Sequence, residues 1–271
     1  MTLQIDTHVH VVSDDLDAFP LAADGPDDAW YRVAPCTVEQ LLALMDEAHV
    51  AAAVLVQGVS AYGTDNRYTA ESARRFPGLC TSVGCVDLSA DEPEEAVREL
   101  VDEEDMRGIR WWGIGDAGLA EPHAVWGTAY SLGVPMVVTI LPNRLGELAE
   151  TIPVIPPIPI ALDHCGFADF SRGVPAELAA LAAAPTVHLK VSTIVLDQMG
   201  KHGDMREAVA ELAAVFGSSR LMWGSDWSQT HDRPYPALAE HARDAAAKLG
   251  EDDRDRFLGR TAATLWPELA P

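Results

Sequence analysis

The sequence predicts an α/β fold, a TIM-type (β/α)8 barrel, and two observations carry the prediction. Short apolar runs recur along the chain, and an amphipathic stretch separates each run from the next, which is the pattern of repeated βα units. The chain has 271 residues, of which 48% are hydrophobic, so it can bury one large core, and α/β barrels of this length form one domain. We therefore expect residues 1–271 to form a single barrel domain.

Eight apolar runs are the expected strands, and eight amphipathic stretches are the expected helices. The strands are expected at residues 3–10, 51–57, 80–86, 108–112, 134–140, 158–162, 187–191 and 220–223. The helices are expected at residues 38–48, 66–75, 93–103, 124–132, 145–150, 175–183, 205–216 and 235–249. Strand starts recur roughly every 25 to 50 residues, as this barrel requires. The longest gap follows the first strand and holds a polar segment, residues 13–35, which is too long for a simple connection, so we expect it to form a lid.

The charge balance restricts the partners of this protein. The chain has 19 basic and 42 acidic residues and a net charge of −23, which argues against nucleic acid and anionic membranes as partners. No apolar stretch is long enough to span a membrane, and the N-terminus lacks the basic and apolar regions of a signal peptide. We therefore expect a cytoplasmic protein that binds a small-molecule substrate, with no nucleic-acid or membrane partner. The oligomeric state stays open, a homo-oligomer included.

Aspartate and histidine alternate in the first expected strand, where Asp6, His8 and His10 are two residues apart. In an extended strand such residues share one face, so the three side chains point the same way. Imidazole is a good ligand for zinc and similar divalent ions, and two imidazoles supply half of a tetrahedral set. This strand therefore carries a candidate ligand or proton-transfer cluster.

Further polar residues fall at the carboxyl ends of the expected strands. Active sites of (β/α)8 barrels lie at that end, on the loops that follow the strands. A purely structural barrel has no reason to collect three histidines and an aspartate there. The residues are His8 and His10 in the first strand, Gln57 after the second, Arg110 in the fourth, His164 after the sixth, Lys190 and Ser192 in the seventh and Asp226 after the eighth.

Three motifs follow one another along the chain: Asp-x-His-x-His at residues 6–10, Asp-His-x-Gly at 163–166 and Gly-Ser-Asp-Trp at 224–227. Together they resemble the amidohydrolase superfamily, in its amidohydrolase-2 branch. The end of the second strand, Val-Gln at 56–57, and the loop Tyr-Gly-Thr-Asp-Asn at 62–66 are similar to the 2-pyrone-4,6-dicarboxylate lactonase and sugar-lactonase group. The resemblance implies a distorted (β/α)8 barrel that hydrolyses a lactone or a related carbonyl substrate.

The resemblance implies roles for individual residues. Asp226 resembles the general base that takes a proton from water. His8, His10 and His164 either hold a divalent ion together with that carboxylate or, without metal, hydrogen-bond the substrate carbonyl and stabilise the charge that develops on it. Arg110 is expected to orient the substrate. The other candidates for substrate binding are Tyr62, Asn66 and Trp227, with loop-structure or packing roles as the alternative.

The cofactor stays open between one divalent ion, such as zinc, and none. The fifth expected strand, residues 134–140, lacks the histidine that metal-using relatives in the superfamily place there, and the fourth has no lysine for carbamylation. A binuclear site is therefore not expected. Around a single ion, His8, His10 and Asp226 would leave coordination positions open for water and substrate.

The expected substrate carries at most one carboxylate. Phe167 follows the sixth-strand motif at the position where the dicarboxylate enzyme of the similar group has an arginine, and the stretch 193–200, expected as a loop, has none. Guanidinium groups recognise carboxylates in a bidentate way, and Arg110 is the one obvious candidate. A sugar lactone or an aromatic-derived lactone fits this pattern. Candidate walls of the pocket, or alternatively core residues, are Trp30, Trp111, Trp112 and Trp227.

Two other functions stay open. One is a zinc-dependent, non-oxidative decarboxylase or hydratase of the same superfamily, which would hold a tightly bound metal and lack lactonase activity. The other is a non-catalytic barrel that binds a metabolite or a protein partner, which would bind its ligand without turnover.

Overall fold

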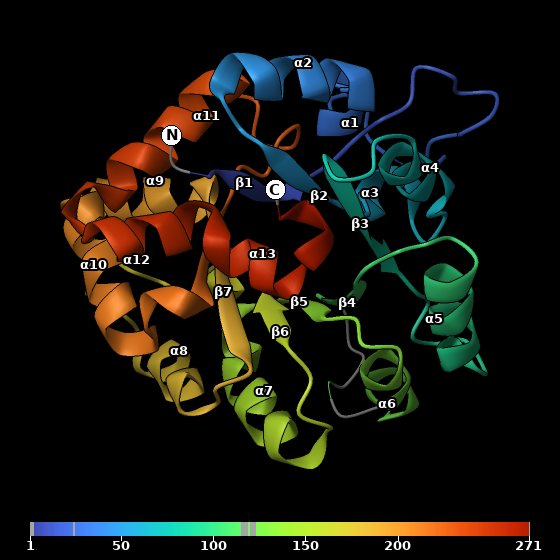
Figure 1. Ribbon diagram of the computed structural model, residues 1–271. Helices are drawn as coiled ribbons and strands as arrows, with labels where there is room; N and C mark the ends of the chain where they lie inside the picture. The colour runs from blue at the N-terminus through green and yellow to red at the C-terminus, as the bar shows by residue number, and fades with distance from the viewer. Residues whose placement is uncertain (1–2, 24, 115–118, 120–122, 271) are drawn as a thin grey trace.

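The computed structural model describes residues 3–23, 25–114, 119 and 123–270. Eight parallel strands follow one another in sequence order around a barrel, and helices cover its outside (Figure 1). A bridge between Val9 and Trp227 joins the first strand to the segment after the last. The predicted (β/α)8 barrel is therefore confirmed. The strands are β1 (Ile5–Val9), β2 (Ala52–Val56), β3 (Cys80–Cys85), β4 (Ile109–Gly113), β5 (Met136–Ile140), β6 (Ile160–Leu162), β7 (Val187–Ser192) and β8 (Leu221–Gly224).

A helix forms in each of the eight predicted stretches. These helices are α2 (Val38–Ala48), α4 (Arg67–Arg75), α5 (Pro93–Asp102), α6 (His123–Ser131), α7 (Leu145–Thr151), α8 (Ala176–Ala180), α10 (Met205–Phe216) and α11 (Tyr235–Ala245). The described residues also form α1 (Trp30–Val33), α3 (Val59–Tyr62), α9 (Thr193–His202), α12 (Glu251–Asp255) and α13 (Thr261–Leu265). Within this part of the chain no helix is both long and apolar enough to cross a lipid bilayer.

The sequence of α2 shows how these outer helices form. Thr37 and Gln40 make a capping box at its start, in which each side chain accepts a hydrogen bond from the backbone N–H of the other residue. Val38, Leu41 and Met45 recur at helical spacing and are buried. The helix therefore packs one apolar face against the barrel.

The expectation of a loop at residues 193–200 is wrong, because α9 begins directly after β7. Its buried side chains Val195, Leu196 and Met199 give the helix an apolar face at helical spacing. Polar residues and Gly200 interrupt this pattern in the sequence. The helix contains no arginine, so it supplies no guanidinium group for a second carboxylate of a substrate.

The two ends of the barrel differ in polarity. Apolar side chains such as Val54, Val137 and Met222 fill its interior, and Trp266 packs against them. The indole of Trp266 donates a hydrogen bond to the carbonyl of Arg107 (3.0 Å), just before β4, so the C-terminal segment closes the amino end of the strands. Figure 1 shows α13 lying across that end. Polar chemistry is therefore left to the carboxyl end.

The segment expected as a lid, residues 13–35, is fastened to α3. The hydroxyl of Tyr62 accepts a hydrogen bond from the backbone N–H of Ser13 (2.8 Å). The N–H of Ala22 donates to the carbonyl of Ala61 (2.7 Å). The segment thus has a defined place beside the loop that follows β2.

Replacing Gly224 with alanine tests how closely β1 and β8 pack at the site. A Cβ atom at this glycine would lie 2.7 Å from the Cβ and 3.1 Å from the backbone nitrogen of His8, so the two strands would have to separate. Overpacking of this kind costs about 1–3 kcal/mol, and we expect that loss in the free energy of unfolding measured with denaturant. Gly200→Ala in α9 is the matched control, because nothing lies within 4 Å of the added Cβ and alanine favours a helix. Equal stability of the two variants would contradict the prediction.

Candidate active site

Three predicted site residues meet at the carboxyl end of the barrel. His8 lies in β1, His10 directly follows it and Asp226 follows β8. Their ligand atoms all lie within 4.8 Å of one another. Asp226 Oδ1 is 3.6 Å from His8 Nε2 and 3.5 Å from His10 Nε2. All three side chains are buried, so their interactions are little screened by water.

Hydrogen bonds at Nδ1 fix the tautomer of both imidazoles. Nδ1 of His10 faces the backbone carbonyl of Val56 (2.8 Å), which only accepts, so this nitrogen carries the hydrogen. Nδ1 of His8 donates in the same way to the carboxylate of Asp163 (3.1 Å). Burial holds the pKa of His8 well below its ordinary value, so this ring is neutral at pH 7. With its hydrogen on Nδ1, a neutral imidazole at either position offers the Nε2 lone pair toward Asp226, whose carboxylate also only accepts.

With both imidazoles in this neutral form, three acceptor atoms face one another without a donor. His8 Nε2 and Asp226 Oδ1 have no hydrogen-bond partner among the described residues. Buried polar atoms without a partner are costly, whereas two imidazole nitrogens and a carboxylate oxygen are a common ligand set for a divalent ion. The chemistry of His8, His10 and Asp226 thus fits a single metal ion.

Asp226 is held by its own backbone and by the residues that follow it. Its φ angle of +62° lies in the left-handed region. Its N–H donates to the carbonyl of His8 (2.8 Å), and the hydroxyl of Thr230 donates to its Oδ2 (3.1 Å). Burial alone would raise the pKa of Asp226, but a hydrogen bond from His10 and the charges of the neighbouring imidazoles in their protonated forms lower it to about 2. The carboxylate is therefore ionised at neutral pH.

His164 lies beside this group but is not among its metal-ligand candidates. Residues 164–167 all have positive φ angles, from +51° to +63°, so the chain turns sharply after β6. Nδ1 of His164 lies 2.8 Å from the hydroxyl of Ser192, and its ring centroid is 4.7 Å from that of His8. The sequence grouped His164 with the metal ligands. Among the described residues, the group within ligand reach is His8, His10 and Asp226.

Asp163 organises the polar interior next to the site. Its Oδ1 lies 3.1 Å from both His8 Nδ1 and Lys190 Nζ. Its Oδ2 accepts hydrogen bonds from the hydroxyl of Thr139 (2.6 Å) and from Nη2 of Arg110 (3.2 Å). Burial alone would raise the pKa of Asp163, but Lys190, His8 and Arg110 hold it well below its ordinary value. The ionised carboxylate therefore holds one imidazole and two buried cations in place.

Arg110 faces the site, but most of its guanidinium is bound to protein groups. Nε and Nη2 donate to Asp163, and Nη1 donates to the carbonyl of Gln57 (2.8 Å). The guanidinium carbon lies 4.6 Å from the ring centroid of Trp112. Of the five guanidinium N–H groups, one on each terminal nitrogen stays available. These two N–H groups are what Arg110 can offer to a substrate.

A cavity of about 100 Å³, which we call the inner cavity, opens onto these groups. Four of the predicted polar site residues line it, namely His10, Arg110, His164 and Asp226. Trp30, Trp112 and Phe167 form apolar walls. Trp30 lies over His10, with ring centroids 5.3 Å apart, and its indole N–H donates to Ser60 Oγ (3.0 Å). The lid segment therefore supplies a wall of the site through Trp30.

Tyr62, Asn66 and Trp227 are not among the residues that line the inner cavity. The hydroxyl of Tyr62 accepts from the lid segment, as described above. The side-chain amide of Asn66 bonds to both the N–H and the carbonyl of Cys85, each at 2.8 Å. Trp227 packs against Tyr235, with ring centroids 5.9 Å apart. In the structure, the described contacts of these side chains hold loops and the core together.

Of the other candidate wall residues, Trp111 stacks on Trp126 in the core, with ring centroids 5.0 Å apart. The sequence patterns gave no role to Asp163, Thr139 or Gln229. Thr139 and Gln229 line the inner cavity. Their positions in the sequence were the signal that could have identified these three residues as part of the site. Asp163 and Thr139 lie at the carboxyl ends of β6 and β5, and Gln229 follows Asp226 by three residues.

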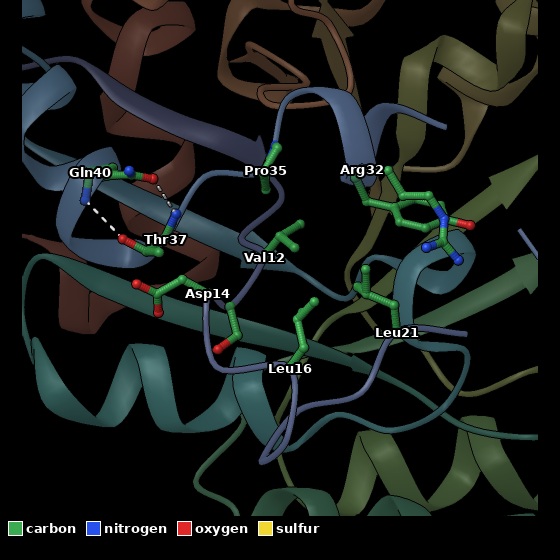
Figure 2. Close-up of a pocket in the computed structure, with 10 residues that line it drawn as sticks. Val12, Asp14, Leu16, Leu21, Arg32, Pro35, Thr37 and Gln40 are labelled. Carbon is green, nitrogen blue, oxygen red and sulfur yellow. Dashed lines mark hydrogen bonds between the residues drawn. The ribbon is translucent and has the colours of Figure 1, made fainter. Parts of the chain in front are cut away.

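A second cavity, of about 350 Å³, lies between the start of the lid segment and the start of α2 (Figure 2). Val12, Leu21 and Arg32 contribute to its walls. None of the predicted site residues lines it. Its larger volume therefore does not make it the active site, because the groups that can do chemistry lie elsewhere.

The fold and this constellation are those of an amidohydrolase. The sequence model of the amidohydrolase family matches residues 5–267. The chain therefore belongs to this family and is a hydrolase, as the three motifs predicted.

Relatives of known name support the lactonase branch of the family. The L-fucono-1,5-lactonase of Burkholderia ambifaria is 32% identical to this chain, over 97% of this chain and 91% of the relative. A 2-pyrone-4,6-dicarboxylate hydrolase of Comamonas testosteroni is 26% identical, over 89% of this chain and 79% of the relative.

Solved structures share the fold over nearly the whole chain. A Pseudomonas putida protein described as a 2-pyrone-4,6-dicarboxylic acid hydrolase superposes with a TM-score of 0.81 at 22% identity, covering 100% of both chains. A Burkholderia multivorans amidohydrolase with bound zinc has a TM-score of 0.74 at 22% identity, covering 98% of this chain and 99% of the other. The 5-carboxyvanillate decarboxylase of Sphingomonas paucimobilis has a TM-score of 0.73 at 14% identity, covering 98% and 99%. At these identities the likeness supports the fold alone.

Replacing Asp163 with asparagine removes the negative charge that faces Lys190 and Arg110. Removing one partner of a buried ion pair costs about 3–5 kcal/mol, because the other charge stays buried without compensation. We expect this loss in the free energy of unfolding. The double variant Asp163→Asn/Lys190→Met should recover part of it, because it also removes a cation. A double variant less stable than the single one would show that unpaired charge is not the cause.

Proposed function

We propose that this protein is a lactonase in which Asp226 activates a water molecule. The observation that carries the proposal is the buried, ionised carboxylate of Asp226 at the wall of the inner cavity, facing Nε2 of both His8 and His10. A carboxylate in that position can accept a proton from water. The 32% identity to L-fucono-1,5-lactonase over nearly the whole chain supports a lactone as the substrate.

The proposed reaction is the hydrolysis of a cyclic ester to a hydroxy acid. Asp226 accepts one proton from water, and the water oxygen forms a bond to the lactone carbonyl carbon. The ring C–O bond then breaks, and the proton held by Asp226 passes to the ring oxygen as it leaves. The second proton of the attacking water stays with the new carboxyl group until it ionises. Every atom of water is therefore found in the product.

We also propose that one divalent ion, such as zinc, is held by His8, His10 and Asp226. The support is the tautomer of the two imidazoles, which present lone pairs and not N–H groups in their neutral forms. Neutral rings of this kind cannot donate hydrogen bonds to a carbonyl oxygen. A bound ion would polarise the lactone carbonyl and lower the pKa of water. His164, whose Nδ1 is held by Ser192, is left to contact the substrate.

The lining of the inner cavity supports a substrate with at most one carboxylate. Among its described lining residues Arg110 is the one permanent cation, and Asp163 already balances part of its charge. Phe167 lies against His164, with ring centroids 4.7 Å apart, and presents an apolar surface. A second carboxylate would therefore be buried without a partner, which is costly.

Replacing Asp226 with asparagine should lower kcat for lactone hydrolysis by about 10²–10⁴-fold, because the amide cannot take up the proton. The measurement is proton release, followed with a pH indicator, on a panel of sugar, aliphatic and aromatic-derived lactones. Asp91→Asn is the matched control, because Asp91 is an exposed carboxylate outside the site. Full activity in Asp226→Asn would exclude this residue as the base. No proton release with any lactone in the zinc-loaded native protein would overturn the lactonase proposal and direct attention to decarboxylation or hydration.

Zinc should stabilise the protein after chelator treatment. An ion that binds only the folded state adds about 2.7 kcal/mol to the free energy of unfolding at 100 times its Kd, which is read as a rise in Tm during a zinc titration. His10→Asn should remove most of this rise, because it replaces one of the three proposed ligands. His202→Asn should not, because His202 is exposed at the end of α9. An identical zinc effect in all three proteins would place the ion elsewhere.

A further inference from the structure

The inner cavity continues into a wider space, which we call the outer recess. The outer recess has a volume of about 740 Å³, compared with about 100 Å³ for the inner cavity. Trp30, Ser60, Trp112 and Gln229 line both spaces. The two spaces therefore meet at these four side chains, and one ligand can extend from the first into the second.

The walls of the outer recess carry no charged side chain among the described residues. The lid segment contributes Ala22, Ala23 and Ala29 to these walls. Asp27 and Asp28 of the same segment are exposed and are not part of the lining. In a chain with a net charge of −23, a wide wall whose described lining side chains are all uncharged favours an apolar occupant next to the site.

The indoles at the junction are held by contacts on the side of the inner cavity. Trp30 bonds to Ser60 and lies over the ring of His10. Trp112 faces the guanidinium of Arg110. Contacts within the protein therefore hold both indoles at the junction, so a group that extends past them meets walls fixed by the protein itself.

We propose that the lactone substrate carries an apolar substituent, an alkyl or aryl group, which occupies the outer recess while the ring is opened in the inner cavity. This inference rests on the proposed lactonase function. The three alanines and Pro26 of these walls offer a hydroxylated substituent no side-chain hydrogen bond in exchange for those it loses to water. An alkyl substituent instead gains about 4-fold in binding for each methylene that leaves water.

The test is the dependence of kcat/KM on chain length in the zinc-loaded, full-length protein. The substrates are δ-valerolactone, δ-octalactone and δ-dodecalactone, which share one ring and differ in their alkyl substituent. We expect kcat/KM to rise by about 4-fold per added methylene until the outer recess is filled. Because the reacting ring is the same in all three substrates, the slope of log kcat/KM against chain length reports binding of the alkyl group in the outer recess and not the chemistry of the ring.

Ala29→Asp is the variant that tests the position of the chain. Ala29 is the N-cap residue of α1, where aspartate is a favoured residue, so the helix should form as before. The new charge should make the wall unfavourable for an alkyl group and flatten the slope. Ala214→Asp, an exposed position in α10, is the matched control and should keep the slope of the native protein.

Each outcome decides the inference. A rising slope that is flattened by Ala29→Asp and kept by Ala214→Asp supports it. Hydrolysis of all three lactones with a flat slope overturns the inference and leaves the lactonase proposal standing. An equal rising slope in both variants also overturns it, because the alkyl group then lies elsewhere. No hydrolysis of these lactones or of the wider panel overturns both proposals.

Discussion

The buried charge of Asp163 is the interaction on which the rest of the site depends. Four strands each direct one polar side chain to this carboxylate, namely His8 of β1, Arg110 of β4, Thr139 of β5 and Lys190 of β7. A carboxylate buried without partners would cost several kcal/mol, so the strands and the charge stabilise one another. The same contact makes Nδ1 of His8 a donor and leaves its Nε2 as a lone pair toward the cavity. The ability of His8 to bind a metal ion through Nε2 is therefore a consequence of its hydrogen bond to the buried carboxylate of Asp163.

Features that depend on local pattern could be predicted from the sequence. Buried parallel strands are continuous apolar runs, so the barrel was visible in the spacing of those runs. The direction of His8 and His10 follows from their two-residue spacing in a strand. The role of Asp163 could not be predicted, because its partners come from residues 8, 110, 139 and 190. A lone aspartate next to a motif histidine looks the same in sequence whether it binds substrate, metal or a buried cation.

Polar loop residues were the least predictable for the same reason. Tyr62 and Asn66 carry groups that suit a hydroxylated substrate, but their partners are backbone groups of the lid segment and of Cys85. Which polar side chain meets the substrate depends on where the backbone leaves unsatisfied groups, and only the tertiary structure shows that. The tryptophans were equally hard to assign from the sequence. Trp111 and Trp112 are neighbours in β4, but their side chains point to opposite faces, so Trp111 packs on Trp126 and Trp112 lines the inner cavity.

Chemistry and specificity are therefore supplied by different parts of the chain. The groups that can react belong to strand ends, which are tied to the buried charge and cannot move without disturbing the barrel. Trp30 belongs to the lid segment and lines both the inner cavity and the outer recess. Its indole N–H donates a hydrogen bond to Ser60. Because the C-terminal segment closes the opposite end of the barrel, substrate recognition can vary only on this side. Differences in substrate among barrels with the same strand motifs should therefore lie in the loops at this end, such as the connection after the first strand and the turn after β6 that carries Phe167, because loops tolerate change.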